Sequence, residues 1–342
     1  MIHPLLVAIV VIDLCAAGLL FAAALRSEPV IRGWAPGDAS ARQIDLERRL
    51  EAASLLGRTG TLTFVVSSIA LLLALTAVLP EIVPGAMCGT GVVEAAKAEW
   101  ALGLRAATLL AIAGWTALDK LDRTAPHAPL ARLTATAILP TAPLSFFAAY
   151  ETLRAVGRLD GQGVVDCCAA VYAESGVETT HAAVTGFEQL AAINVWFFVG
   201  GAVALVVAGL FIGDRGPMRI VPLGAGLAVV TAAWVPLAAE VLVEILAPYH
   251  YEVLAHHCPW CLFRAEHGAV GYPIFGALAL ALAEAVALVA ALIAMSYAAS
   301  IRPSAQNRVR SAGRRIALAV VVFVALATGP AIGWVLRFGV WL

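Results

Sequence analysis

Long apolar runs separated by short polar stretches make up almost the whole chain. Eight of these runs are long enough to cross the hydrocarbon core of a bilayer as helices, which takes about 20 apolar residues. They lie at about 4–25, 60–83, 99–118, 132–155, 186–212, 218–246, 270–298 and 315–340. The pattern predicts an all-α polytopic membrane protein, a bundle of about eight transmembrane helices. Because no long polar region remains, we expect residues 1–342 to form a single integral membrane domain without a sizeable soluble part.

The first apolar run could be mistaken for a secretory signal. A signal peptide starts with a basic segment, but no charged residue precedes this run, and the first basic residue, Arg26, follows it. We therefore expect the run to be retained as the first transmembrane helix.

Composition supports the membrane class. The chain is 61% hydrophobic and 13% charged, whereas a soluble domain is about a quarter charged and less than half apolar. The lipid bilayer is thus the first expected partner. A net charge of −1 gives no basis for binding nucleic acid.

The basic residues predict an orientation. Of the 22 lysines and arginines, 16 lie in alternate polar stretches, namely 26–59, 119–132, 214–219 and 300–315. Basic residues are enriched on the cytoplasmic side of membrane proteins, so these stretches are predicted to be cytoplasmic and both termini extracytoplasmic. The expected location is a bacterial inner membrane, with the other loops facing the periplasm.

Five of the six cysteines fall in the predicted extracytoplasmic loops 84–98, 156–185 and 247–269. They are Cys88, Cys167, Cys168, Cys258 and Cys261, while Cys15 lies inside a predicted span. An odd number of thiols leaves at least one without an internal disulfide, so that it is free, bound to a ligand or paired with another protein.

The clearest motif is His256-His257-Cys258-Pro259-Trp260-Cys261. Two thiols in C-x-x-C spacing can close a disulfide or bind one soft metal ion together. Outside the cytoplasm such a pair is normally oxidised, and its strained disulfide is suited to exchange. We expect a helix to begin near Cys261 or Arg264, and a helix N-terminus stabilises a thiolate. These features favour redox exchange over an inert disulfide or a metal site.

The adjacent pair Cys167-Cys168 suggests a second redox element. Neighbouring cysteines rarely bridge each other, so each is expected to reach a different partner. A disulfide from Cys88 to one of them would tie two loops together and leave the other thiol to face Cys258 or Cys261.

A metal site is the alternative. His256, His257, Cys258 and Cys261 offer soft and borderline ligands for copper or zinc. The chain lacks a second C-x-x-C, so the spacing alone does not define a coordination geometry. This alternative predicts a metal- or haem-handling membrane protein.

Charged residues near the predicted outer ends of the spans are candidate cofactor ligands. Ionisable groups at membrane depth are usually paired or functional. Arg105, Arg154, Arg264 and Glu240 could line a quinone pocket beneath the thiols. The structural alternative is charge pairing between helices, for example Arg105 with Glu240.

An outward-facing C-x-x-C at the mouth of a helical bundle, with further loop cysteines, resembles the membrane thiol oxidoreductases of the DsbB and vitamin K epoxide reductase type. The likeness covers the arrangement of the site only, since those proteins have fewer core helices. It implies a thiol–disulfide oxidoreductase in which Cys258 or Cys261 exchanges. The loop cysteines would pass electrons to or from an extracytoplasmic thioredoxin-like partner, with a quinone as possible acceptor. A third interpretation is a structural or accessory subunit whose loops are braced by disulfides.

Overall fold

The structure is a computed structural model that describes residues 3–159, 181–214, 217–253 and 256–340. Throughout these ranges the regular secondary structure is helical, and none of it is a strand. Eight helical segments are long and apolar enough to cross a membrane: Pro4–Gly33, Ala41–Glu81, Glu99–Asp122, Ala131–Arg158, Asn194–Phe211, Arg219–Tyr251, Gly271–Tyr297 and Ala299–Phe338. Each predicted span overlaps one of them, which confirms the prediction of an all-α protein with eight candidate spans.

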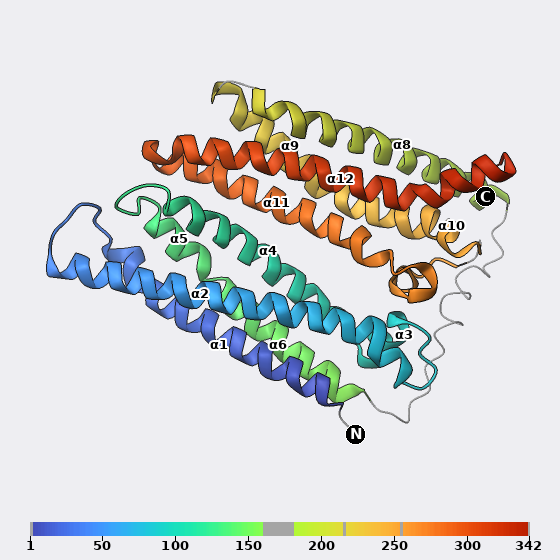
Figure 1. Ribbon diagram of the computed structural model, residues 1–342, viewed down its shortest axis with the longest axis horizontal. Helices are drawn as coiled ribbons and strands as arrows, with labels where there is room; N and C mark the ends of the chain where they lie inside the picture. Colours follow the sequence, from blue (N-terminus) through green and yellow to red (C-terminus); the bar gives the residue numbers. More distant parts are fainter. Residues whose placement is uncertain (1–2, 160–180, 215–216, 254–255, 341–342) are drawn as a thin grey trace. The chain divides into compact units, whose positions relative to one another are not determined.

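The chain divides into two compact units (Figure 1). Unit 1 comprises Met1–Val83, Val92–Gly163 and Val286–Val309. Unit 2 comprises Pro84–Gly91, Val164–Ala285 and Arg310–Leu342.

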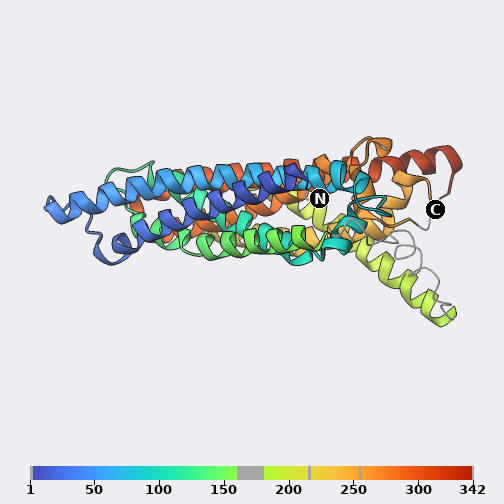
Figure 2. The ribbon, with the colours of Figure 1, turned by 90° about the horizontal axis from the view of Figure 1, so that it is seen from below.

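Five helices form most of unit 1. They are α1 (Pro4–Gly33), α2 (Ala41–Leu73), α4 (Glu99–Asp122), α5 (Ala131–Ile138) and α6 (Thr141–Arg158). Helix α1 packs against α2, α5 and α6, and α4 packs against α5 and α6. Figure 2 shows α1 and α2 side by side in blue. Their contact is close because Gly60 lets the backbone of α2 approach Leu20 of α1.

Helix α2 is longer than the apolar pattern indicated. Ser40 caps its N-terminus by accepting a hydrogen bond from the Gln43 amide, at 3.3 Å. The end of the polar stretch 26–59 and the second span therefore form one uninterrupted helix. A π-turn, η1 (Ala74–Val78), and a short 3-10 helix, η2 (Leu79–Glu81), end this segment. The proline at position 80 explains the termination, since it cannot supply the next helical hydrogen bond.

A buried ion pair links α1 and α4 in unit 1. Arg105 Nη2 donates to the carboxylate of Asp13, and Arg105 also donates to Thr152 Oγ1 at 3.1 Å and to Ser68 Oγ at 3.2 Å. Burial of a charge is tolerated when it is paired and hydrogen-bonded in this way. Asp13, rather than the predicted Glu240, is the carboxylate that pairs with Arg105.

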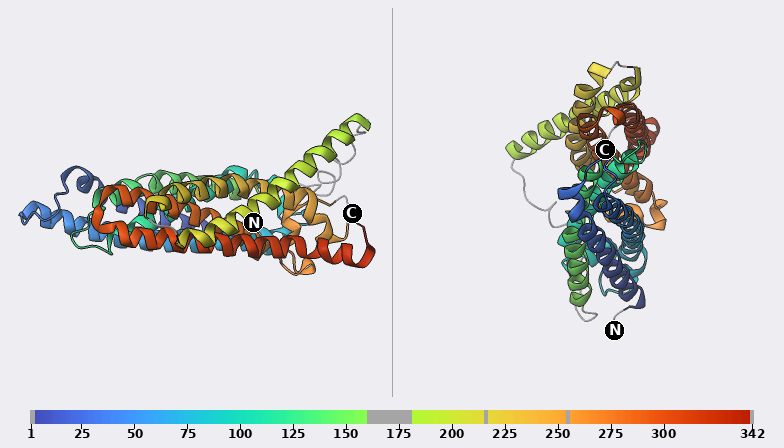
Figure 3. Two further views of the ribbon diagram at one scale, coloured as in Figure 1. Left: turned by 90° about the horizontal axis from the view of Figure 1, so that it is seen from above. Right: turned by 90° about the vertical axis from the view of Figure 1, so that its left-hand side faces the viewer.

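Unit 2 contains α8 (His181–Phe211), α9 (Pro217–Val241) and α10 (Ala247–Tyr251), with parts of α11 (Gly271–Tyr297) and α12 (Arg302–Phe338). Phe198, Trp234 and Phe323 join α8, α9 and α12, with ring centroids 5.6–6.2 Å apart. Figure 3 shows α8 and α12 crossing, and Gly209 meets Gly313 in that contact.

Short elements between α9 and α11 carry the C-x-x-C motif. Helix α9 continues through a π-turn, η5 (Leu242–Leu246), into α10, which ends at Glu252 in the left-handed conformation. Two 3-10 helices follow, η6 (Pro259–Phe263) and η7 (Ala265–His267). The expectation that a helix starts near Cys261 or Arg264 and continues into the seventh span is wrong. The backbone is extended at Arg264 and left-handed at Gly268, so α11 begins only at Gly271.

Candidate functional site

The C-x-x-C motif is a single 3-10 turn. Cys258 is the residue that caps η6, Pro259 is its first residue, and the Cys261 amide donates to the Cys258 carbonyl at 3.3 Å. Proline fits the first helical position because its fixed φ is already helical and its missing N–H would have no partner there. In a 3-10 helix side chains three residues apart lie on the same side. The turn therefore presents both thiols in one direction.

Neighbouring aromatic residues hold this turn in place. The Tyr251 hydroxyl donates to the Cys258 carbonyl at 2.5 Å. At the other end Phe263 stacks on Phe275 of α11, with centroids 5.4 Å apart, and Leu262 is fully buried. The turn is thus fixed to α10 on one side and to α11 on the other.

The segment Met87–Thr90 lies against the turn, although 170 residues separate Cys88 from Cys258. Arg264 Nη1 donates to the Met87 carbonyl at 2.5 Å. The Trp260 indole lies so close to Gly89 that a Cβ atom at that position would be 2.4 Å from the ring. Only glycine leaves room for this approach, which brings the preceding cysteine to the motif.

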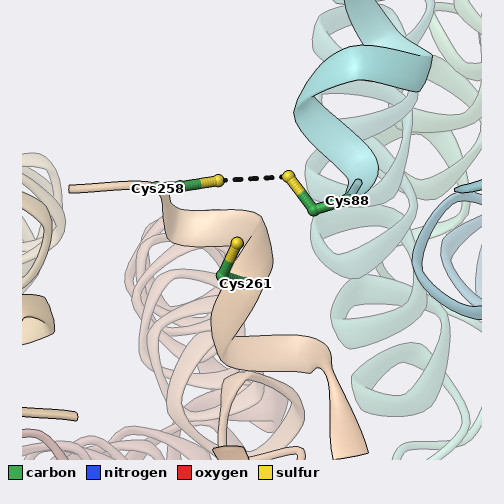
Figure 4. A group of neighbouring side chains, drawn as sticks. All are labelled: Cys88, Cys258 and Cys261. Carbon is green, nitrogen blue, oxygen red and sulfur yellow. Dashed lines mark hydrogen bonds between the residues drawn. The ribbon is translucent and has the colours of Figure 1, made fainter. Parts of the chain in front are cut away.

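Cys88, Cys258 and Cys261 form a buried group that we call the thiol cluster. Their three sulfur atoms all lie within 4.8 Å of one another, and Cys88 Sγ is 3.4 Å from Cys258 Sγ (Figure 4). The Thr90 hydroxyl is 3.0 Å from Cys258 Sγ. Cys88 and Cys258 are 2% exposed and Cys261 is 9% exposed. No disulfide joins cysteines within the described parts of the chain.

Hydrogen bonds shift the pKa values of the Cys258 and Cys261 thiols in opposite directions. The hydrogen bond from Cys261, and then that from Cys88, lowers the pKa of the Cys258 thiol, because S–H donors stabilise its thiolate. The same hydrogen bond to Cys258, followed by the contact with Cys88 and by burial, raises the pKa of Cys261. The cluster therefore holds one negative charge most readily on Cys258.

Arg264 supplies a positive charge beside the cluster. Its guanidinium also binds the Glu266 carboxylate, through contacts of 3.0 and 3.1 Å, and this bond lowers the pKa of Glu266. The side chain thus connects the backbone next to Cys88 with η7. Arg264, one of the four predicted cofactor-binding residues, therefore binds the backbone directly beside Cys88.

The other three predicted cofactor-binding residues have the following surroundings. Arg105 binds Asp13 inside unit 1. Arg154 pairs with Glu151 on the same helix at 2.7 Å, and Glu240 is exposed on α9. Their predicted role at a quinone pocket stays a prediction.

The two histidines of the motif point to other partners. The His256 ring packs edge-on against Tyr251, at 4.6 Å between centroids, and burial lowers the pKa of His256. His257 Nδ1 is 3.3 Å from the Val243 carbonyl and 4.0 Å from a Glu244 carboxylate oxygen. Within the described parts of the chain, the group of metal-ligand atoms around Cys258 and Cys261 is completed by Cys88 and includes neither histidine.

Cys167 and Cys168 lie outside the described residues. Their predicted disulfide with Cys88, and their predicted role in electron transfer, stay predictions. Cys88 itself faces Cys258 (Figure 4).

Sequence reasoning missed the residues that align the two segments, namely Gly89, Thr90, Tyr251 and Trp260. The one available signal was the Gly-Thr-Gly sequence directly after Cys88, which can indicate close backbone approach as well as a turn. The aromatic residues resemble ordinary interface anchors, because nothing in the local pattern reveals a contact across so many residues.

Comparisons of the chain with protein-family models, with curated proteins and with solved structures found no match. Function must therefore be argued from the site. Three adjacent thiols can exchange one disulfide among themselves, or they can share one soft cation.

Proposed function

We propose that this protein is a membrane thiol–disulfide oxidoreductase that works through the thiol cluster. One observation carries the proposal: Cys88 Sγ lies 3.4 Å from Cys258 Sγ, in a group of three thiols from two distant segments. A disulfide bond is about 2.05 Å long. A movement of about 1.4 Å would therefore close a bond between the segments, which is within reach of side-chain rotation.

The internal step needs no external reagent. Starting from a Cys258–Cys261 disulfide, the Cys88 thiolate attacks Cys258 Sγ, the Cys88–Cys258 bond forms, and Cys261 leaves as a thiolate. One S–S bond is made and one is broken, so the oxidation state of the cluster is unchanged. Exchange proceeds in this way through in-line attack by a thiolate on a disulfide sulfur.

Net turnover requires an outside dithiol or disulfide. A partner dithiol, such as that of a thioredoxin-like protein, would attack Cys261 Sγ while the Cys258–Cys261 disulfide is in place, since Cys261 is the least buried of the three cysteines. This attack forms a mixed disulfide and releases the Cys258 thiolate. The partner's second thiolate would then attack the partner sulfur of the mixed disulfide, which completes the partner disulfide and leaves Cys258 and Cys261 reduced. An acceptor, for which a quinone is the candidate class, would then remove the two electrons and restore the disulfide. Cys167 and Cys168 are proposed as the intermediate carriers.

The proposed location of the protein is the inner membrane. The apolar helices fit a lipid-embedded protein. The distribution of basic residues supports an inner-membrane location with the cluster on the periplasmic side, where thiols are normally oxidised.

Disulfide mapping in native membranes tests the proposal. After blocking of free thiols, the Cys261→Ser variant should accumulate a Cys88–Cys258 disulfide, and the Cys88→Ser variant a Cys258–Cys261 disulfide. Peptide mass spectrometry identifies each bond. The Cys258→Ser variant should trap a partner protein that is supplied in its disulfide form: the Cys261 thiolate attacks the partner disulfide, and the mixed disulfide persists because Cys258, which would resolve it, is missing.

Cys15→Ser is the matched control, since Cys15 lies on α1 in unit 1 and should leave every pattern unchanged. The proposal fails if the Cys258→Ser/Cys261→Ser double variant still captures the same partners. It also fails if no disulfide within the cluster forms under mild oxidation.

A further inference from the structure

The reduced thiol cluster has the composition of a soft-metal site. Three cysteine sulfurs from two segments converge in a buried position, and the predicted histidine ligands are directed elsewhere. Cysteine thiolates select copper(I), zinc and iron–sulfur clusters over harder cations. The ligand set is therefore all-sulfur, which differs from the mixed His/Cys set that the sequence suggested.

The spacing of the sulfurs fits a single ion. With metal–sulfur bonds of about 2.3 Å, three sulfurs around one ion are separated by about 3.8–4.0 Å. The sulfurs of the cluster lie within 4.8 Å of one another, and Cys88 Sγ is 3.4 Å from Cys258 Sγ. An ion could enter with sulfur shifts of well under 1 Å, so the segments are already aligned for it.

The surroundings suit a thiolate ligand. The Thr90 hydroxyl lies 3.0 Å from Cys258 Sγ, where it can donate to a metal-bound sulfur. The Arg264 guanidinium, fixed to the Met87 carbonyl, brings a positive charge close to the excess negative charge of three thiolates.

We propose that the reduced cluster binds one copper(I) ion through Cys88, Cys258 and Cys261. Structural zinc is almost always four-coordinate, and the described residues provide three ligands. Copper(I) is the softer of the two ions, and three thiolates satisfy it. Binding consumes the same sulfur lone pairs that attack a disulfide. A copper-loaded cluster is therefore inactive in thiol exchange, which makes copper occupancy a control on the proposed activity.

The test uses the full chain, purified in detergent and reduced with a phosphine under anaerobic conditions. The substitutions Cys167→Ser and Cys168→Ser form the background, so that bound metal can be assigned to the cluster. Copper(I) is supplied by a chromophoric chelator of known affinity. The expected result is one copper per chain, with three sulfur neighbours at roughly 2.3 Å by X-ray absorption.

Single variants in that background identify the ligands. Cys88→Ser, Cys258→Ser and Cys261→Ser should each weaken copper(I) binding by at least 100-fold, and Thr90→Val by about 10-fold, as is usual for a group that hydrogen-bonds a ligand. Cys15→Ser should have no effect. Loss of binding in the background itself, or unchanged affinity in Cys88→Ser, overturns the proposal. Tighter retention of zinc than of copper(I) overturns the choice of metal.

Copper binding rests on the same cluster as the proposed exchange activity, but different results would contradict the two proposals. Cys88→Ser removes one copper ligand but keeps the C-x-x-C pair. Partner trapping that persists while no variant binds copper contradicts this inference alone. Copper binding without any exchange contradicts the proposed function alone.

Discussion

At the scale of single residues, the segment Met87–Thr90 determines the site. Each of its four residues makes a different contact with the C-x-x-C turn or with Arg264 just after it. The Met87 carbonyl accepts a hydrogen bond from Arg264, and the Cys88 thiol lies against Cys258. The Gly89 Cα lies against the Trp260 indole, and the Thr90 hydroxyl lies close to Cys258 Sγ. The contacts are consecutive, so a shift of one residue in this segment would misplace all four. The position of Cys88 thus depends on its neighbours as much as on its own side chain.

Gly89→Ala tests the indole contact. The new Cβ would lie 2.4 Å from Trp260, so the ring or the segment must move away. We expect mild oxidation to form the Cys88–Cys258 disulfide at least 10-fold more slowly in the Cys261→Ser background, because a misplacement near 1 Å is costly for a reaction between positioned groups. Quenched-flow alkylation with mass spectrometry measures the rate. Gly103→Ala, at a glycine with open space around it, is the control and should not change it.

Arg264→Gln tests the link to the Met87 carbonyl. Loss of this charge-assisted hydrogen bond should release the segment and increase the rate at which a maleimide modifies Cys88 by about 10-fold, equivalent to about 1.4 kcal/mol. Glu266→Gln removes the exposed carboxylate but keeps the bond to Met87, so its effect should be below 2-fold. An equal increase in both variants would show that the Arg264–Glu266 pair, rather than the bond to Met87, holds the segment.

The sequence predicted the three cysteines of the thiol cluster, but not the contacts that bring them together. The C-x-x-C spacing pointed to Cys258 and Cys261. The prediction that their loop and the loop of Cys88 lie on the same side of the membrane grouped the three cysteines together. The histidines were included because they are adjacent in sequence, yet the backbone turns them toward Val243 and Tyr251. Contacts between distant segments depend on tertiary packing, which a local pattern does not contain.

At the scale of helices, polar contacts inside the apolar units are few and buried. The Asp13–Arg105 pair, with side chains 0% and 5% exposed, joins α1 to α4 in unit 1. Breaking a buried pair leaves one charge uncompensated, which is more damaging than removal of both charges.

Asp13→Asn or Arg105→Met should therefore each reduce the free energy of unfolding by about 3–5 kcal/mol. The double variant should lose less than the sum of the two, because neither charge then remains unpaired. Denaturant titration in detergent micelles measures the differences. Arg154→Gln, which breaks the exposed pair with Glu151, is the control and should change stability by less than about 0.5 kcal/mol. Additive losses would argue against a direct pair.

The crossing of α8 and α12 makes a second prediction at this scale. A Cβ on Gly209 would lie 2.4 Å from the Gly313 carbonyl oxygen, and a backbone atom cannot rotate away. Gly209→Ala should force the helices apart and reduce the free energy of unfolding by about 1–3 kcal/mol. Gly200→Ala on the same helix meets nothing within 4 Å, so it should be neutral or slightly stabilising. Equal effects would mean that the crossing is loose.

The apolar pattern predicted the helices well, but not how far some of them extend beyond the apolar run. Span-length runs are unambiguous in composition, so all eight predicted spans have counterparts. Such extensions depend on caps instead: Ser40 starts α2 well before the apolar run, whereas the predicted seventh span, 270–298, agrees with α11. These signals act on single residues and were not visible in the hydropathy of longer windows.

At the scale of the whole molecule, the proposed exchange depends on which side of the membrane the thiol cluster faces. In the cytoplasm, reducing conditions would keep the three thiols reduced, whereas in the periplasm a disulfide persists. The concentration of 16 of the 22 basic residues in alternate polar stretches predicts the periplasmic side. The proposed exchange therefore depends on this orientation.

Cysteine labelling on intact spheroplasts tests the orientation. Ala39→Cys lies in the exposed turn between α1 and α2, which is predicted to be cytoplasmic, and Val340→Cys lies just after α12, at the predicted periplasmic end. An impermeant maleimide should modify Val340→Cys in intact spheroplasts and Ala39→Cys only after permeabilisation, with both sites resolved by peptide mass spectrometry. The reverse pattern would move the predicted cysteine loops to the cytoplasm. With the loops in the cytoplasm, the oxidising environment that keeps a disulfide in the cluster would be absent. Copper(I) binding by the reduced cluster would not be affected.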